Sequence, residues 1–518
     1  MYTGKRVLSI HLALKIILLN RFDFYLLTGY VNTIPYKKPS KVQIFTPTAY
    51  LQQEITMKKS FIFILPALAF ALCGTENFIP VEDIEPGSWF LRSIRHSRPQ
   101  LEKGFLEKLD KLDPYPERAR CAELYNRMLD EKFISNRAED AAIEKALNWK
   151  SGDFTWHNNK YYARPGCTSW IIAPDASSTG TYIVQKNRDY MGQNNLTFRL
   201  FKSASGRFKI AVVGDLWSSG AGAAMNEKGL MIVQNDGTSR WKHPDKVNIG
   251  STFILRYIAE HCANIEEASA VLKKFHTMGF VRSASLYLLA DLNRGMILEG
   301  TASHHASADV NFAFEVRANN YLLPGMRFVS TRNRKSFISG SHRRYTASDF
   351  LNRTLTEKGK ISPADLTKLS RLRIPEAEKE KFRQICCKYT LASTMFIPDR
   401  MFPAYLSATF VALGPTRHTV FLPIPMGISA VPESLSNGLW GKKALALAEK
   451  LPLDHNRLPE FEKIENKFME EFISVREKAR LLLLERKNSE AVKLLDELFR
   501  RQYKEAGDFL DKISGENK

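Results

Sequence analysis

Short apolar runs separated by turn residues occupy the middle of the chain, and longer periodic stretches lie on both sides of them. Between residues 167 and 437 the runs predict strands at 170–172, 181–184, 210–214, 230–235, 285–290, 295–299, 391–398, 405–414 and 418–424. Helices are predicted among them at 252–262, 265–275 and 341–372, with a Ser-Pro helix start at 362–363. This pattern predicts a mixed protein of helices and sheets, and periodicity alone goes no further.

Both flanks of this region are predicted to be helical. Residues 99–149 alternate charged with apolar positions at helical spacing. From residue 438 onward, apolar residues recur at three- and four-residue steps along one face of a long helix: Phe461, Ile464, Phe468, Phe472, Val475, Ala479 and Leu482. An Asn-Ser pair at 488–489 ends this helix and caps the next. We expect the resulting helical hairpin to pack on the body of the protein or on a second copy of the chain, which makes a homo-oligomer one expectation.

Residues 57–73 have the features of a secretory signal peptide. A Met-Lys-Lys-Ser start is followed by an apolar stretch at 61–72, and Ala-Phe-Ala at 69–71 fits a cleavage site. We therefore predict that Met57 is the initiator and that residues 1–56 are upstream sequence. The protein is then expected to be exported, either to the periplasm or out of the cell.

Two alternatives for the N-terminus stay open. In one, residues 1–56 are a true extension with a membrane segment at 8–30, although three charged residues interrupt that stretch. In the other, Cys73 is a lipoprotein attachment site, although Leu72 is a poor match just before it.

Charge and composition exclude several classes of function. The 518 residues are 44% hydrophobic, enough for a large core, and carry a formal net charge of +20. Lys and Arg are spread along the chain, and the sequence has no zinc-ligand spacing, phosphate loop or basic-aromatic array. We expect no nucleic-acid partner, no metal and no cofactor. The His pair at 304–305 and the His-Cys pair at 261–262 lack partners at ligand spacing and are expected to be surface or core residues.

Export would permit disulfides. Besides Cys73 and Cys167, the chain has Cys121, Cys262, Cys386 and Cys387. Four cysteines allow three pairings, and adjacent cysteines rarely pair with each other. All four could equally be core thiols, so the sequence leaves both interpretations open.

The candidate chemistry lies in residues 166–169 (Gly-Cys-Thr-Ser) and 186–189 (Lys-Asn-Arg-Asp). Each group adjoins a predicted strand, and a Ser/Gly turn joins the two strands into a hairpin. The hairpin would place Cys167 beside Asp189, which makes a candidate nucleophile with an orienting group. Taken alone, Cys167 is also compatible with a buried core thiol.

A cut of the chain just before Cys167 would supply the missing base. A thiol has a reference pKa of about 8.5, whereas a free α-amino group titrates near about 7.7–8.0. The new amine on Cys167 could therefore take the thiol proton and later return one to the leaving amine, with no histidine. Gly166 suits the residue before the cut, because self-cleavage needs a backbone that tolerates unusual conformations.

A second run extends the pattern: Met-Asn-Glu-Lys-Gly-Leu at 225–230 feeds a strand that ends at Asn235. Together with the Cys-Thr and Asn-x-Asp pair, it resembles the Cys-type N-terminal nucleophile amide hydrolases. These include choloylglycine hydrolase, penicillin V acylase, the isopenicillin N acyltransferase relatives and acid ceramidase. The resemblance implies an α+β fold, the four-layer αββα sandwich. It divides the chain into a helical pro-region at 74–166 that can stay bound after cleavage, a catalytic domain at 167–437 and a helical extension at 438–518.

The resemblance also implies roles for further residues. Asn235, helped by the main chain, would form the oxyanion hole, although a turn residue is the alternative. The segment 323–333 would supply a second active-site Asn, and Asn333 fits after a shift of one residue, unless Arg332 has replaced the amide. In the Ser-His-Arg-Arg-Tyr run at 341–345, Arg344 is the better match to an arginine near the nucleophile.

The strand that carries Asp189 departs from the bile-salt-hydrolase-like pattern. Lys186 stands where those relatives carry Arg, and a Lys is a point charge without Arg's planar fork. Lys186 and Asn187 are expected to support the nucleophile or the substrate.

The resulting hypothesis is an exported, self-processing cysteine hydrolase that cleaves a linear acyl-amide C–N bond through a Cys167 acyl-enzyme. Its partner would be a small acyl-amide substrate. An acyltransferase and a dipeptidase-like aminohydrolase are alternatives within the same superfamily. A non-catalytic envelope binding protein is an alternative of another class, and an uncut chain would favour it.

Overall fold

The computed structural model describes residues 76–81, 131–154, 166–189, 196–203, 206–216, 218–237, 250–277, 285–301, 303–330, 334–375 and 383–515. The predictions for residues 1–56 and for the signal peptide at 57–73 lie outside these ranges. The same holds for Cys73, Cys121, Arg332 and Asn333.

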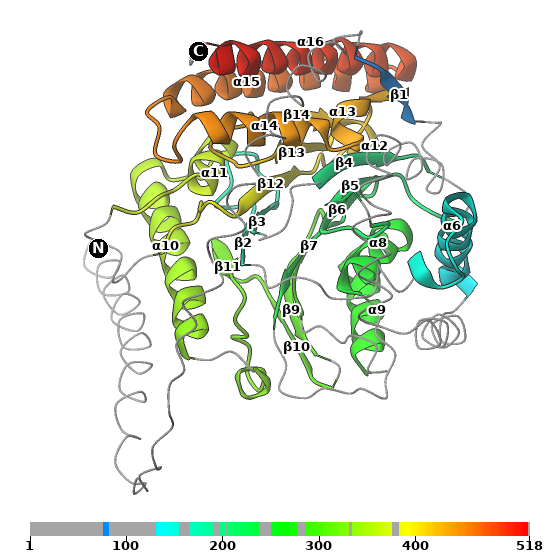
Figure 1. Ribbon diagram of the computed structural model, residues 1–518, viewed down its shortest axis with the longest axis vertical. Coiled ribbons are helices and arrows are strands. Elements are labelled where there is room, and N and C mark those ends of the chain that lie inside the picture. Colours follow the sequence, from blue (N-terminus) through cyan, green and yellow to red (C-terminus); the bar gives the residue numbers. More distant parts are fainter. Residues whose placement is uncertain are drawn as a thin grey trace, which may run out of the picture. The chain divides into compact units, whose positions relative to one another are not determined.

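Two antiparallel β-sheets form the centre of the described structure (Figure 1). One has the strand order β10-β9-β8-β7-β6-β5-β4, and the other the order β11-β2-β3-β12-β13-β14. The first consists of β4 (Leu196–Phe201), β5 (Ile210–Asp215), β6 (Ala223–Asn226), β7 (Met231–Asp236), β8 (Ser285–Ala290), β9 (Gly295–Gly300) and β10 (His305–Asp309). The second consists of β2 (Cys167–Ile172), β3 (Ile183–Asp189), β11 (Phe314–Arg317), β12 (Thr390–Ile397), β13 (Ala408–Leu413) and β14 (Leu422–Pro425).

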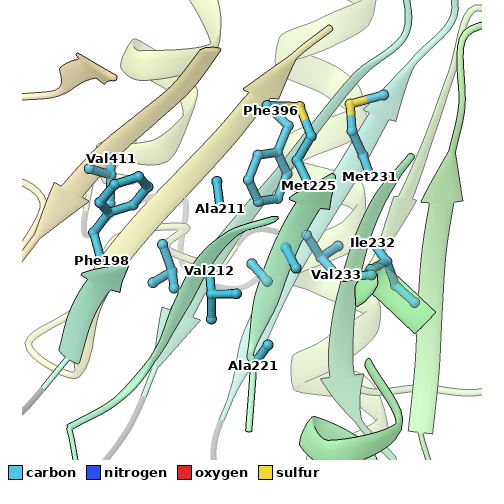
Figure 2. Close-up of a cluster of buried hydrophobic side chains, with 14 of the residues drawn as sticks. Phe198, Ala211, Val212, Ala221, Met225, Met231, Ile232, Val233, Phe396 and Val411 are labelled. Carbon is cyan, nitrogen blue, oxygen red and sulfur yellow. The ribbon is translucent and has the colours of Figure 1, made fainter. Parts of the chain in front are cut away.

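The two sheets pack face to face, with β2 and β3 against β7 and β8. Figure 2 shows apolar side chains of the first sheet, among them Phe198 and Val233, together with Phe396 of β12 and Val411 of β13. Every residue of β2 and β8 is buried. Burial on both sides explains why β8 carries a continuous apolar run after Ser285 rather than an alternating pattern.

Helices cover the outer face of each sheet (Figure 1). On the first sheet, α8 (Ser251–His261) lies over β5, β6 and β7, and α9 (Ile265–Thr277) over β9 and β10. On the second, α10 (Arg334–Lys358) and α11 (Pro363–Ser370) place Leu351 and Leu366 in one cluster with Trp170 of β2. The αββα sandwich that the resemblance implies is therefore confirmed.

The predicted helix at 341–372 is two helices rather than one. Ser362 caps α11 and Pro363 occupies its first turn, so the predicted Ser-Pro helix start is confirmed. Short elements connect the remaining strands: η2 (Arg327–Val329), α12 (Pro403–Leu406), β15 (Ala430–Pro432), α13 (Glu433–Ser436) and α14 (Leu439–Lys450).

Two pieces of the segment before Cys167 are built into the folded body. β1 (Phe78–Pro80) pairs antiparallel with β15. In α6 (Glu131–Leu147), the carboxylate of Glu139 binds the buried guanidinium of Arg256 on α8 at 2.9 Å. Ile143, Leu147 and Phe154 belong to the main core cluster. Residues on both sides of the predicted cut therefore share one core.

The C-terminal hairpin consists of α15 (Leu458–Leu484) and α16 (Asn488–Gly515), which pack against each other and on β14. Phe461, Phe468 and Phe472 are buried, in agreement with the predicted apolar face. Within this face Glu465 accepts two hydrogen bonds, each 2.6 Å long, from the buried Arg371 that follows α11. The described hairpin thus packs on the body of its own chain.

Among the described residues, no helix contains a stretch that is both long and apolar enough to span a bilayer. The four described cysteines, Cys167, Cys262, Cys386 and Cys387, are free thiols. The sequence left disulfides and free thiols open as alternatives, and these described cysteines agree with free thiols.

Candidate active site

Cys167 is the first residue of β2, and it lies directly opposite Arg188 of β3. The predicted hairpin is therefore confirmed, and its register also pairs Ser169 with Lys186. Cys167 is only 2% exposed. The nucleophile candidate thus sits at the start of a central strand, inside the sandwich.

Alternation along the two strands sorts their side chains onto two faces of the sheet. The face toward β7, here called the thiol face, carries Cys167, Ser169, Lys186 and Arg188. Its direction follows from Ser169, whose hydroxyl donates to Asn235 Oδ1 of β7 at 2.7 Å. The opposite face, here called the carboxylate face, carries Asn187 and Asp189 and lies toward α10 and α11.

The Asp189 carboxylate is held on two sides. Arg343 of α10 donates to Oδ2, and the Thr390 hydroxyl donates to Oδ1 at 2.6 Å. The Asp189 main-chain N–H donates to Gly166 O at 2.9 Å. A Cβ atom on Gly166 would lie 3.1 Å from Asp189 Oδ2 and 3.0 Å from Arg343 Nη1. Glycine before Cys167 is therefore also what lets this ion pair approach the backbone.

The arginine on Asp189 is Arg343, whereas the sequence favoured Arg344 as the arginine near the nucleophile. Consecutive helical residues point about 100° apart, because the helix has about 3.6 residues per turn. Only one of the two can therefore face β3. Burial has the largest single effect and lowers the pKa of the Arg343 guanidinium, but the Asp189 carboxylate and the Cys387 sulfur together leave this pKa raised. Arg343 also approaches the Cys387 sulfur, 3.8 Å from Nη2.

Asn319 is a site residue that the sequence analysis missed. The Cys167 N–H donates to Asn319 Oδ1 at 2.9 Å, and Asn319 Nδ2 donates to Asp236 O at 2.8 Å. Arg317, the last residue of β11, pairs with Ser169. Continuing this register by two residues places Asn319 opposite Cys167, so a correct pairing of 314–317 with β2 would have found it.

Asn235 lies beside the site but is bonded differently from the expectation. Both hydrogens of its Nδ2 are donated to main-chain carbonyls, Arg317 O and Ala318 O, at 3.0 Å each. Its Oδ1 accepts from Ser169, and the residue is fully buried. In this arrangement Asn235 fixes the segment before Asn319 rather than directing an N–H to an oxyanion.

Asn187 lies on the opposite face of the sheet from Lys186. Its Nδ2 donates to Ser370 O at 2.7 Å on the carboxylate face. Lys186 and Asn187 are neighbours on one strand, so they cannot both face the thiol. Asn187 therefore anchors the end of α11, and of these two residues only Lys186 lies on the thiol face.

The thiol face is rich in positive charge. Burial raises the pKa of the Cys167 thiol, and among nearby charges Lys186 opposes this rise most strongly, with a smaller contribution from Arg188. Arg188 is paired with Asp215 of β5 at 2.7 Å. Burial lowers the pKa of Lys186, whose Nζ donates to the main-chain oxygens of Gln234 and Gly222. A thiolate formed here would be stabilised by Lys186 and, more weakly, by Arg188, and destabilised by the Asp236 and Asp189 carboxylates.

Within the described ranges, no group of three or more His, Cys, Asp or Glu residues could hold a metal ion. The chemistry that this arrangement offers is therefore that of a thiol, a carboxylate–guanidinium pair, an amide and a buried amine.

Comparison with protein families gives a match to acyl-coenzyme A:6-aminopenicillanic acid acyl-transferase over residues 176–395. This stretch contains Asp189, Asn235, Asn319 and Arg343. This match to an acyltransferase agrees with the resemblance drawn from the sequence, which includes acyltransferases. No curated protein matches the chain.

Several solved structures are similar to this chain at low identity. A conjugated bile acid hydrolase from Clostridium perfringens is 12% identical, with 50% of this chain and 92% of that chain covered and a TM-score of 0.34. The Caenorhabditis elegans ortholog of N-acylethanolamine-hydrolyzing acid amidase is 18% identical, with coverages of 45% and 94% and a TM-score of 0.32. Penicillin V acylase from Agrobacterium tumefaciens is 13% identical, with coverages of 50% and 86% and a TM-score of 0.32.

Proposed function

We propose that the chain is a self-processing cysteine hydrolase of linear acyl amides, with Cys167 as its N-terminal nucleophile. One observation carries the proposal: the peptide bond between Gly166 and Cys167 lies where the thiol, the Asp189–Arg343 pair and the Asn319 amide meet. Thiol, carboxylate and amide are the groups that acyl transfer through a cysteine requires.

Self-cleavage between Gly166 and Cys167 would give Cys167 a free α-amine. Its nitrogen already has one acceptor, Asn319 Oδ1. Departure of Gly166 would open the space beside the Asp189 carboxylate, which would hold the amine when it is protonated. An α-amine titrates near about 7.7–8.0, so it can act as a base near neutral pH.

In amide hydrolysis, the amine takes the thiol proton as sulfur attacks the substrate carbonyl carbon. The second hydrogen of Asn319 Nδ2 is the side-chain donor that we assign to the oxyanion, because the first is donated to Asp236 O. The protonated amine then gives its proton to the leaving nitrogen as the C–N bond breaks. Water attacks the thioester, the acid is released and the thiol is restored.

An acyltransferase is the second candidate, because the matching family model is named for one. It needs only that an acceptor amine replaces water in the last step. Incubating the acyl-enzyme with primary amines and measuring amide against free acid would separate the two activities. A dipeptidase-like aminohydrolase would instead release free amino acids from dipeptides.

The cleaved pro-region is proposed to stay bound. The pairing of β1 with β15 and the Glu139–Arg256 ion pair support this, because neither involves the bond to be cut. After cleavage, two fragments should elute together on native size exclusion and separate in denaturant. Elution as separate species without denaturant would contradict it.

The activity test uses matured protein with a panel of N-acyl amides that differ in acyl chain, followed by release of the amine. Wild type should release amine, and both Cys167→Ala and iodoacetamide-treated protein should not. Release of amine by Cys167→Ala at the wild-type rate would refute Cys167 as the nucleophile.

Export is proposed from the signal-like sequence at 57–73. N-terminal sequencing of the pro-fragment from the natural source should give a start shortly after residue 71. A pro-fragment that starts at Met1 would contradict both the export and the assignment of Met57 as initiator.

A further inference from the structure

We propose that Lys186 is the base that takes the thiol proton of Cys167 during self-cleavage, before the α-amine of Cys167 exists. This inference rests on the self-processing function proposed above. In the uncut chain the Cys167 nitrogen is an amide whose N–H donates to Asn319. An amide nitrogen has no basic lone pair, so the first cut needs a proton acceptor other than the one that serves later turnovers.

Lys186 is placed within reach of the thiol. It lies opposite Ser169, on the thiol face, and is therefore the diagonal neighbour of Cys167 across the β2–β3 pair. Diagonal neighbours in an antiparallel pair lie about 7–8 Å apart, a span that a long side chain covers. Lys186 and Cys167 are also the charges that act most strongly on each other.

The hydrogen bonds of Lys186 suit a neutral amine. Its Nζ donates to Gln234 O, and also to Gly222 O at 3.4 Å. A neutral amine has two N–H donors and one lone pair, so these two carbonyls would occupy both donors and leave the lone pair open. None of the contacts described for Lys186 is an ion pair with a carboxylate. Arg188 on the same face differs, because Asp215 pairs with it.

The surroundings act in both directions on the charge of Lys186. Burial has the largest effect and lowers its pKa, and the neighbouring Arg188 lowers it further. The Cys167 thiolate, Asp236 of β7 and Asp215 of β5 raise it. On balance the pKa of Lys186 is lowered. Lys186 therefore begins to lose its proton at a lower pH than a lysine in water does.

In the proposed step, one proton moves from the Cys167 thiol to Lys186 and then to the Cys167 nitrogen. The lone pair of Lys186 Nζ takes the S–H proton, and the thiolate attacks the carbonyl carbon of Gly166. The ammonium of Lys186 returns this proton to the Cys167 nitrogen as the C–N bond breaks, which leaves a thioester and a free α-amine. Water hydrolyses the thioester to a Gly166 carboxylate and the Cys167 thiol.

This role distinguishes lysine from arginine at position 186. An arginine stays protonated under all ordinary conditions, so it can stabilise a thiolate but cannot accept its proton. A lysine whose pKa is lowered by burial can do both.

The test follows self-cleavage of the full chain by intact mass over time, in wild type, Lys186→Arg and Lys186→Met. A positioned general base contributes about 10²–10⁴-fold, so both variants should cleave at least about 100-fold more slowly at neutral pH. The exposed Lys228 gives the matched control, and Lys228→Arg should cleave at the wild-type rate. Thermal melting establishes that each variant is folded.

Chemical rescue separates proton acceptance from packing. In Lys186→Ala, added methylamine or ethylamine should restore cleavage at least about tenfold, because a small amine can fill the space and take the proton. Lys186→Arg or Lys186→Met that cleaves as fast as wild type would overturn the role of Lys186 and leave self-processing intact. So would a folded Lys186→Ala that no amine rescues. A wild type that stays whole would instead overturn the proposed function itself.

Discussion

The two faces of the β2–β3 pair differ in how completely their charges are matched. On the carboxylate face, Asp189 is bonded by Arg343 on one oxygen and by Thr390 on the other. On the thiol face, Arg188 has Asp215, whereas Lys186 donates to two main-chain oxygens and has no ion pair among the described residues. A saturated ion pair is a rigid support, and a buried amine without a carboxylate is a group that can exchange a proton.

The difference indicates a division of tasks within four consecutive residues of β3. Asn187 anchors the end of α11 and Asp189 binds the Gly166 backbone, whereas Lys186 and Arg188 act electrostatically on the sulfur. The Gly166–Cys167 peptide bond is the place where the faces meet, because its nitrogen belongs to Cys167 and its carbonyl carbon to Gly166 beside Asp189.

The largest expected effect comes from breaking the support on the carboxylate face. Asp189→Asn leaves the Arg343 guanidinium buried without its counter-charge, beside the Gly166 backbone that self-cleavage would break. Removing one partner of a buried pair costs about 3 kcal/mol or more, and we expect self-cleavage to slow by about 10³-fold. Denaturant unfolding and intact-mass time courses measure the two effects.

The double variant Asp189→Asn with Arg343→Met is the control for this prediction. It should recover part of the stability, since no unpaired charge remains, but none of the cleavage. A single Asp189→Asn variant that cleaves at the wild-type rate would remove the carboxylate from the mechanism.

The next effect separates two amides that lie close in space. Asn319→Ala should lower kcat for amide hydrolysis by about 10²–10³-fold, the usual cost of one oxyanion donor, with a small loss of stability. Asn235→Ala removes three buried hydrogen bonds and should lower the free energy of unfolding by about 2 kcal/mol or more. If Asn235→Ala lowers kcat more than Asn319→Ala does, the oxyanion assignment is wrong.

A smaller effect is expected at Thr390. Valine keeps the shape but removes the hydroxyl that donates to Asp189 Oδ1 and accepts from the Cys387 N–H. A single hydrogen bond to a charged group contributes about 1.5–3 kcal/mol, and part of this remains through Arg343, so turnover should fall about tenfold. Steady-state kinetics of Thr390→Val against Thr390→Ser would measure it, because serine restores the hydroxyl.

The smallest effect on the reaction is expected at Asn187. Its side chain donates to Ser370 O on the carboxylate face, which is the opposite face of the sheet from the thiol. Asn187→Ala should lower the free energy of unfolding by about 1–3 kcal/mol, and the matured enzyme should keep its kcat. Loss of kcat in a folded Asn187→Ala protein would return Asn187 to the nucleophile side.

What the sequence predicted well was local. The hairpin of residues 167–189 follows from two apolar runs and a turn between them, so Cys167 and Asp189 could be placed together. The apolar face of α15 follows from helical periodicity, and burial of Phe461, Phe468 and Phe472 agrees with it.

The features that the sequence missed depend on contacts between residues far apart in the chain or on the rotation of a helix about its axis. Asn319 is opposite Cys167 only because β11 pairs with β2, a contact between residues about 150 positions apart. The choice between Arg343 and Arg344 depends on the rotation of α10 against β3, which periodicity does not fix. The direction of the Asn235 amide is set by the carbonyls of Arg317 and Ala318. Strand alternation alone, however, could have separated Lys186 from Asn187.

The most direct test of the central claim is the intact mass of the chain expressed from Met57, under denaturing conditions, for wild type and Cys167→Ala. Self-processing predicts that wild type gives two masses, one for the fragment that ends at Gly166 and one for the fragment that begins at Cys167. Cys167→Ala should stay whole apart from loss of the signal. A wild type that also stays whole would contradict the claim, since Cys167 would then have no α-amine, and a folded binding protein would become the better account.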